Sequence, residues 1–193
     1  MDDSVLELKE RIVDAAIVAF NESGARFTLQ EVSRLLNISK KTIYTCFESK
    51  EALIEAMITT GFESVKESER LIIEEPNLST LEKIRKVVVI IPEKYADLDF
   101  KKFESIKARY PKLYKQILDH IETEWEPTIA LIEQGMREGV IRQLPIPVLK
   151  TIIEASMERF LEGELDRTSG MDYIKALDWM MTILLEGITS EVV

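Results

Sequence analysis

Apolar residues recur at three- and four-residue spacing along most of this chain, which is the pattern of amphipathic helices. The first stripe extends from about Val5 to Ser23, and Gly24 follows as a residue that ends helices readily. Further stripes predict helices over about 50–75, 80–95, 100–109, 112–138, 148–164 and 171–186. Because the 193 residues include only 7 Gly and 6 Pro, we predict an all-α protein.

The apolar run VVVII at 87–91 is the one segment that also fits a buried strand. The helical stripe on both sides of the run and the lack of any partner strand favour a helix. Pro92 is expected to bend or end that helix. Pro127 lies inside the helix expected over 112–138 and is predicted to kink it.

Residues 28–47, TLQEVSRLLNISKKTIYTCF, have the pattern of two short helices joined by a tight turn. Thr28 and Glu31 have the spacing of a capping box at the first helix. Asn37 tolerates the left-handed conformation that ends a helix, and Ser39 is placed to cap the second one. The apolar face expected for the first helix consists of Leu29, Val32, Leu35 and Leu36.

The second short helix combines an apolar anchor with a polar, cationic outer face. Ile43 and Phe47 are expected to be buried, whereas the outer face consists of Lys40, Lys41, Thr42, Tyr44 and Thr45. Two such helices at a steep angle form a helix-turn-helix, whose second helix enters the DNA major groove. The sequence therefore favours a DNA-binding protein.

The order and spacing of many N-terminal residues is similar to the N-terminal domain of TetR-family transcriptional regulators. The residues that carry the resemblance are Ile12, Ala15, Ala16, Phe20, Gly24, Phe27, Thr28, Tyr44, Phe47, Ser49, Lys50, Glu51 and Leu53. The resemblance covers about the first third of the chain, and the segment 132–142 is similar to the end of the family's seventh helix. Two pairs depart from the common pattern, Lys41-Thr42 and Thr45-Cys46, so no operator sequence follows from the resemblance.

We predict two domains. Residues 1–48 form a three-helix helix-turn-helix domain, and residues 49–193 form a larger helical bundle for ligand binding and dimerisation. The helix that starts near residue 50 joins them.

Each residue type in the helix-turn-helix suits one kind of DNA contact. Thr28 and Ser39 lie at helix N-termini, where free amides bind phosphate, and Lys50 adds a charged phosphate contact. Lys41 suits guanine acceptors, and the methyl groups of Thr42 and Thr45 suit the thymine methyl. The resemblance implies that Tyr44 packs on the sugar-phosphate backbone. The alternative is that Tyr44 is a core aromatic and that the lysines, Lys40 included, are only solvated.

The net charge of −10 is unevenly distributed. Residues 1–50 hold 7 Lys and Arg against 8 Asp and Glu, and the remaining residues hold 18 against 27. The acidic excess therefore lies outside the helix-turn-helix. It can orient the protein on DNA by repulsion from other faces, or it only keeps the surface soluble.

Catalysis and cofactor binding have little support in the sequence. The chain has one His, His120, and one Cys, Cys46, and it lacks GxSxG, HExxH and Gly-rich phosphate-binding motifs. Neither an apolar leader nor an apolar run of membrane-spanning length is present. We expect a cytoplasmic protein that is not an enzyme and has no cofactor.

Several aromatic residues of the second domain fall on segments that, in the resembled family, surround a ligand cavity. These candidates are Phe62, Phe103, Tyr110, Tyr114, His120, Trp125 and Phe160. An aromatic stripe at helical spacing is also what an ordinary helical core contains, so both interpretations stay open.

The resemblance implies a homodimeric repressor that a small-molecule ligand releases from a palindromic stretch of double-stranded DNA. Dimerisation is expected through the last two helices, which carry more apolar surface than one subunit can cover. Two alternatives remain: a DNA-binding regulator without a small ligand, controlled by a protein partner or acting as an activator, and a helical interaction module that does not bind DNA.

Overall fold

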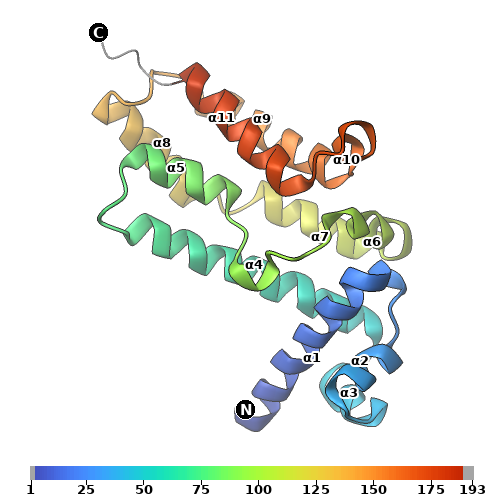
Figure 1. Ribbon diagram of the computed structural model, residues 1–193. Helices are drawn as coiled ribbons and strands as arrows, with labels where there is room; N and C mark the ends of the chain where they lie inside the picture. The colour runs from blue at the N-terminus through green and yellow to red at the C-terminus, as the bar shows by residue number, and fades with distance from the viewer. Residues whose placement is uncertain (1–2, 189–193) are drawn as a thin grey trace. The chain divides into compact units, whose positions relative to one another are not determined.

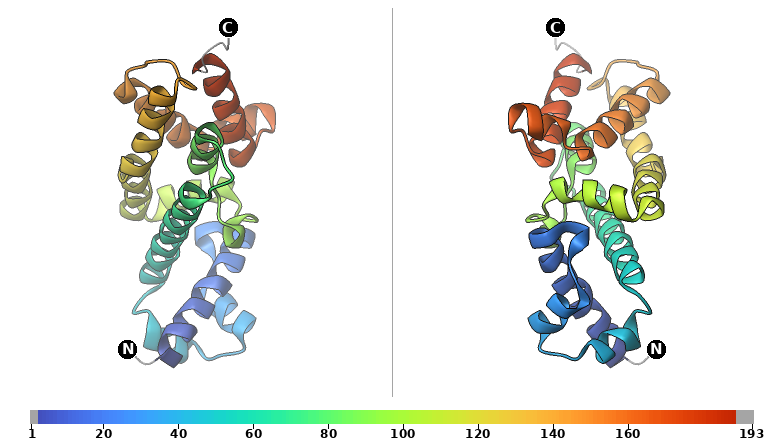
Figure 2. Two further views of the ribbon diagram at one scale, coloured as in Figure 1. Left: turned by 90° about the vertical axis from the view of Figure 1, so that its left-hand side faces the viewer. Right: turned by 90° about the vertical axis from the view of Figure 1, so that its right-hand side faces the viewer.

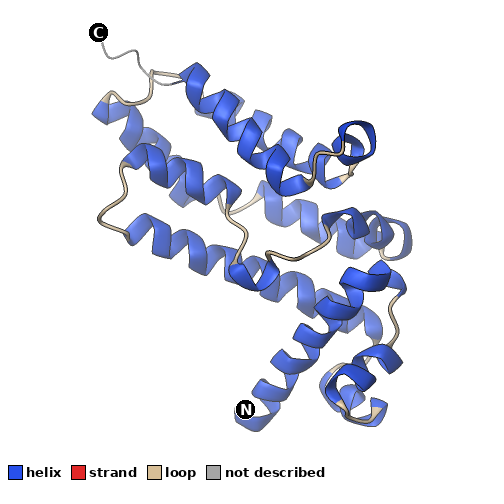
Figure 3. Cartoon of the chain, in the orientation of Figure 1, coloured by secondary structure: helices blue, strands red, loops and turns tan. Residues whose placement is uncertain are grey.

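The computed structural model describes residues 3–188, and every element within them is helical (Figures 1 and 3). The α-helices are α1 (Asp3–Ser23), α2 (Leu29–Leu36), α3 (Lys40–Cys46), α4 (Lys50–Glu74), α5 (Thr80–Val89), α6 (Phe103–Arg109), α7 (Pro111–Glu122), α8 (Glu126–Glu138), α9 (Ile146–Leu161), α10 (Glu164–Ser169) and α11 (Tyr173–Ile188). Three short 3-10 helices are η1 (Gly24–Arg26), η2 (Glu93–Tyr95) and η3 (Phe100–Lys102). The all-α prediction is confirmed, and Val87–Val89 of the ambiguous apolar run lie in α5.

The chain divides into two compact units. Unit one comprises the chain up to Phe62 together with Asp97–Ile117, and unit two comprises Glu63–Ala96 and the chain from Leu118 onward. Helices α4 and α7 each contribute to both units. These units differ from the predicted boundary after residue 48 because α6 and the first half of α4 pack with the N-terminal helices. The predicted boundary is a division by function and stays a prediction.

In unit one, α1 contacts both α2 and α3 (Figure 2). Its core side chains include Ile12, Phe20, Phe27, Ile43 and Leu53, all of which are fully buried. Burying such side chains contributes about 1.5–3 kcal/mol each, which stabilises α2 and α3, two short helices that have little stability alone.

Helix α6 closes unit one against η1. The backbone N–H of Ala25 donates to Ser105 Oγ at 2.7 Å, and the side chain of Asn21 bonds to the backbone of Asp97 and Asp99. Gly24 has a φ of 59°, and a Cβ at this position would lie 2.6 Å from Ser105 Oγ. A glycine is therefore needed here for both its conformation and its size.

In unit two, α11 packs on α5 and α9, and α5 packs on α8. The most deeply buried side chains include Ile84, Ile132, Ile141, Ile153 and Leu177. Gly135 of α8 allows close packing, since a Cβ there would lie 2.8 Å from the Ile141 side chain.

The prediction of a single helix over 112–138 is wrong. The segment forms two helices, α7 and α8, which are separated at residues 123–125, where Glu124 has a left-handed φ of 59°. Pro127 lies in the first turn of α8, where its missing N–H costs no helical hydrogen bond. The proline therefore starts a new helix instead of kinking an old one.

Other predicted boundaries also need correction. Helix α5 ends at Val89, so Tyr95 lies outside it in η2, because Pro92 cannot continue the hydrogen-bond pattern. Helix α10 was not predicted. Leu35, placed on the apolar face of α2, is exposed, because α2 buries Leu29 and Val32 while its last turn is open to solvent.

Candidate nucleic-acid interface

The first helix of the predicted helix-turn-helix begins at a complete capping box. Glu31 N–H donates to Thr28 Oγ1 at 3.3 Å, and Thr28 N–H donates to the Glu31 carboxylate at 2.5 Å. This backbone hydrogen bond, followed by the one from the Thr28 hydroxyl, lowers the pKa of Glu31. The box fixes the start of α2 at the residue that the sequence indicates.

The turn between α2 and α3 is held by local bonds. Asn37 has a φ of 53° and caps α2 in the left-handed conformation. Ser33 Oγ donates to the carbonyl of Ile38 at 2.6 Å, so a side chain of α2 stabilises the backbone of the turn. Ser39 then caps α3, accepting from Thr42 N–H at 3.0 Å. These contacts set the direction in which α3 leaves the turn.

Helix α3 is amphipathic in the way that the sequence predicts. Ile43 is fully buried, and Phe47 directly after the helix is buried as well. Lys40, Lys41 and Thr45 are exposed, and Tyr44 is 54% exposed. Since Tyr44 is not a core aromatic, the interpretation of this residue as buried packing is wrong.

The outer face of α3 carries unneutralised positive charge. Within residues 3–188, neither Lys40 nor Lys41 forms an ion pair with a carboxylate, whereas ion pairs such as Lys66–Glu69 and Arg85–Asp178 occur elsewhere. An exposed helix with two free ammonium groups, hydroxyls and an aromatic ring fits the phosphates and base edges of DNA.

Lys50 has a different position from the one expected of a phosphate contact. Its ammonium donates to the carbonyl of Ala25 at 2.7 Å and lies 4.5 Å from the centre of the Phe27 ring. Burial, and then the nearby Arg109 guanidinium, lower the pKa of Lys50. These contacts favour a packing role inside unit one, and the phosphate contact stays a prediction.

Comparison with known proteins agrees with this geometry. The sequence profile described as "Bacterial regulatory proteins, tetR family" matches residues 12–57, which contain most of α1, all of α2 and α3, and the start of α4. Residues 12–57 therefore match the DNA-binding part of the TetR family of transcriptional regulators.

Similarity to known proteins extends over nearly the whole chain. It is similar to the uncharacterized HTH-type transcriptional regulator YvaF of Bacillus subtilis (strain 168), with 22% identity over 95% of this chain and 97% of that one. A TetR transcriptional regulator from Chloroflexus aurantiacus J-10-FL has a similar structure, with a TM-score of 0.67, 25% identity and 95% of each chain covered. FadR from Bacillus subtilis, solved in complex with stearoyl-CoA, has a TM-score of 0.59 at 16% identity over 93% of this chain and 98% of that one.

The predicted ligand-binding aromatics do not fall in one compact unit. Phe62, Phe103, Tyr110 and Tyr114 belong to unit one, and His120, Trp125 and Phe160 belong to unit two. Phe103 stacks on Phe100 and meets Phe20 edge-on, which is ordinary core packing. Trp125 is 9% exposed, belongs to the core of unit two and donates its indole N–H to the carbonyl of Ile121 at 2.8 Å. The role of these residues in ligand binding stays a prediction.

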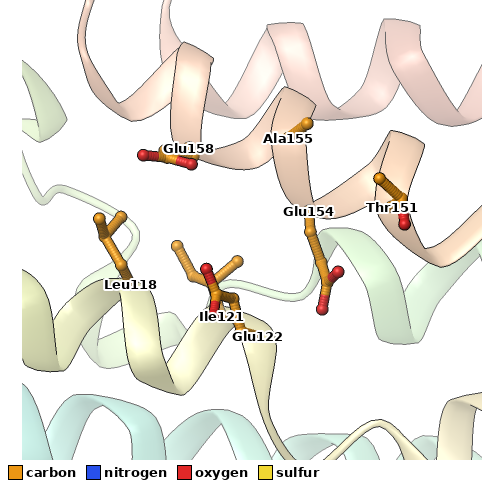
Figure 4. Close-up of a pocket in the computed structure, with 7 residues that line it drawn as sticks. All are labelled: Leu118, Ile121, Glu122, Thr151, Glu154, Ala155 and Glu158. Carbon is orange, nitrogen blue, oxygen red and sulfur yellow. The ribbon is translucent and has the colours of Figure 1, made fainter.

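Unit two contains a cavity of about 170 Å³ between α7 and α9 (Figure 4). Its lining consists of Leu118, Ile121, Glu122, Thr151, Glu154, Ala155 and Glu158. Glu154 forms an ion pair with Lys150 at 3.1 Å. None of the predicted ligand-binding aromatics lines this cavity. The sequence did not indicate this cavity, because glutamates on helices are usually solvated and do not suggest a cavity lining.

Apolar side chains are exposed on two helices of unit two. On α11, Trp179 is 58% and Ile183 is 66% exposed, and Val148 and Ile152 are exposed on α9. Helices α9 and α11, which carry these exposed residues, pack against each other. None of the helices between residues 3 and 188 has the length and apolarity needed to span a bilayer.

Proposed function

We propose that this protein is a homodimeric, sequence-specific repressor of the TetR family that binds a palindromic operator and is released by a small molecule. The observation that carries the proposal is the outer face of α3. Lys40, Lys41, Tyr44 and Thr45 are exposed there on a helix that Ile43 anchors in the core of unit one. Lys41 and the two threonines are the proposed base contacts, and Lys40 and Tyr44 are the proposed backbone contacts.

The exposed apolar residues of α9 and α11 support a homodimer. Two copies paired through these helices form a four-helix interface across a two-fold axis. Such a dimer presents two α3 helices to half-sites about 34–36 Å apart on DNA. The palindromic operator follows from this symmetry.

Helix α4 is the proposed route from effector to DNA. It is continuous from Lys50 to Glu74 and contributes to both compact units. An effector that binds unit two more tightly in one arrangement of α4 shifts the dimer toward that arrangement. The α7–α9 cavity is one proposed site for this effector, and FadR, which has a similar fold and was solved in complex with stearoyl-CoA, supports a small-molecule effector.

The test is selection of duplexes from a random-sequence DNA library, followed by titration of the enriched duplex and of scrambled DNA between about 50 and 200 mM salt. We expect the enriched duplex to bind about 10³-fold or more tightly than scrambled DNA. Lys41→Ala should reduce this ratio, whereas the matched surface change Lys175→Ala on α11 should not. A library that yields no enriched sequence would favour the interaction module without DNA binding. An enriched duplex that no candidate effector releases would favour the ligand-independent regulator.

A further inference from the structure

The hydroxyl of Thr45 is occupied within α3. Its O–H donates to the backbone carbonyl of Thr42 at 2.6 Å, although Thr45 lies on the exposed face of the helix. A helical threonine adopts one of two rotamers because its oxygen can bond a carbonyl in the preceding turn. This bond turns Oγ1 toward the helix backbone and leaves the methyl group as the outer part of the side chain.

Thr42 is less available for base contacts. Its backbone N–H donates to Ser39 Oγ at 3.0 Å, and its hydroxyl lies 2.9 Å from the same oxygen. Its side chain is only half-exposed. Thr42 is therefore part of the cap that starts α3, whereas Thr45 lies one turn further along with no capping role.

Lys41 and Thr45 lie on the same stripe of α3. Residues four apart on a helix have Cβ atoms about 5–6 Å apart. Successive bases on one DNA strand are about 3.4 Å apart along the helix axis. The two side chains can thus reach bases that are one or two steps apart.

We propose that Thr45 is a specificity-determining residue that recognises thymine through methyl–methyl contact in the major groove. The inference rests on the proposed DNA binding. Thymine is the only base with a methyl group at this edge, and a side chain whose proton is already donated cannot donate to a base acceptor. Each half-site therefore contains a thymine one or two steps from the base that Lys41 contacts. The thymine methyl makes the contact and the Thr45 hydroxyl does not.

The experiment uses the full-length protein and a duplex selected from a random library. Each thymine of the half-site is replaced in turn, symmetrically, by deoxyuridine, which lacks only the 5-methyl group. Wild type, Thr45→Ser and Thr45→Val are titrated against each duplex. Serine keeps the hydroxyl and loses the methyl, and valine does the reverse.

At one thymine position, replacement by deoxyuridine should weaken the DNA affinity of wild type and of Thr45→Val about fourfold per half-site. This factor corresponds to the burial of one methyl group. Thr45→Ser should be insensitive to deoxyuridine at that position. The control Thr59→Ser, at an exposed threonine on α4, should stay as sensitive as wild type.

Other outcomes overturn the inference. Equal sensitivity of Thr45→Ser and wild type at every position would assign the methyl contact to another residue. Loss of affinity in Thr45→Val alone would assign recognition to the hydroxyl as an acceptor. An enriched duplex with neither effect refutes the role of Thr45 and leaves the proposed function intact, whereas the absence of any enriched duplex refutes both.

Discussion

The Lys50 ammonium donates to the backbone carbonyl of Ala25, and the two atoms are 2.7 Å apart. Ala25 is fully buried, so no water replaces this donor in the folded protein. This bond joins the first residue of α4 to Ala25 of η1. The backbone N–H of the same alanine donates to Ser105 of α6. A lysine that the sequence assigns to DNA is thus part of the packing of unit one.

Lys50→Met should destabilise the protein by about 1–3 kcal/mol, because it leaves the buried Ala25 carbonyl without its partner. The salt dependence of DNA affinity should keep its slope, since the ammonium is directed into the protein. Urea denaturation and DNA titrations across salt measure the two effects. Lys40→Met is the contrasting variant, for which we expect unchanged stability and a slope lower by about one. A lower slope with full stability in Lys50→Met would restore the phosphate contact predicted from sequence.

Trp179→Glu and Ile183→Glu should each convert the protein from dimer to monomer. Both side chains are exposed on α11, and a carboxylate in an apolar interface loses its hydration without a partner. Sedimentation at micromolar concentration should give twice the 22.2 kDa chain mass for wild type and 22.2 kDa for the variants. Leu71→Glu is the control, because Leu71 is 55% exposed on α4 and lies outside the proposed interface. Dimers in both α11 variants would exclude this surface.

Trp125→Ala should cost about 3–5 kcal/mol of stability, as for other large aromatic side chains removed from a core. Trp125→Phe should cost less because it keeps most of the packing and loses the hydrogen bond to Ile121. Thermal melts and DNA titrations with and without an effector distinguish core from pocket. Full stability with an altered effector response would instead place Trp125 in the ligand site.

Two capping boxes, Thr28 with Glu31 at α2 and Ser79 with Glu82 at α5, should make the protein less stable in acid. Hydrogen bonds from Thr28 lower the pKa of Glu31, and hydrogen bonds from Ser79 lower the pKa of Glu82. In the folded state these carboxylates bind protons less readily than in the unfolded state. Their stabilisation is therefore present above the ordinary glutamate pKa of about 4.3 and is lost as the pH falls through the lower folded-state values.

Urea denaturation between about pH 5 and pH 3 tests this expectation. Glu31→Gln and Glu82→Gln keep a side chain that can close a capping box, and each should lose less stability on acidification than wild type. Glu63→Gln on the exposed side of α4 should behave like wild type. If all three variants follow the wild-type curve, the boxes do not contribute to the acid dependence.

The sequence by itself determined the features that depend on neighbours in the chain. Capping at Thr28 and Ser39 was predicted correctly because a cap joins residues three apart. The amphipathic pattern of α3 likewise indicated that Ile43 is buried and Lys41 exposed. Since such patterns act within one or two turns, they defined the helix-turn-helix.

Only the tertiary structure decided where long side chains point and which apolar residues find a partner. The direction of Lys50 depends on Ala25, which is 25 residues earlier in the chain. Trp125 is buried in the core of unit two, whereas Trp179 on α11 is exposed. Both outcomes depend on contacts between segments distant in sequence, and no local periodicity records which segments meet.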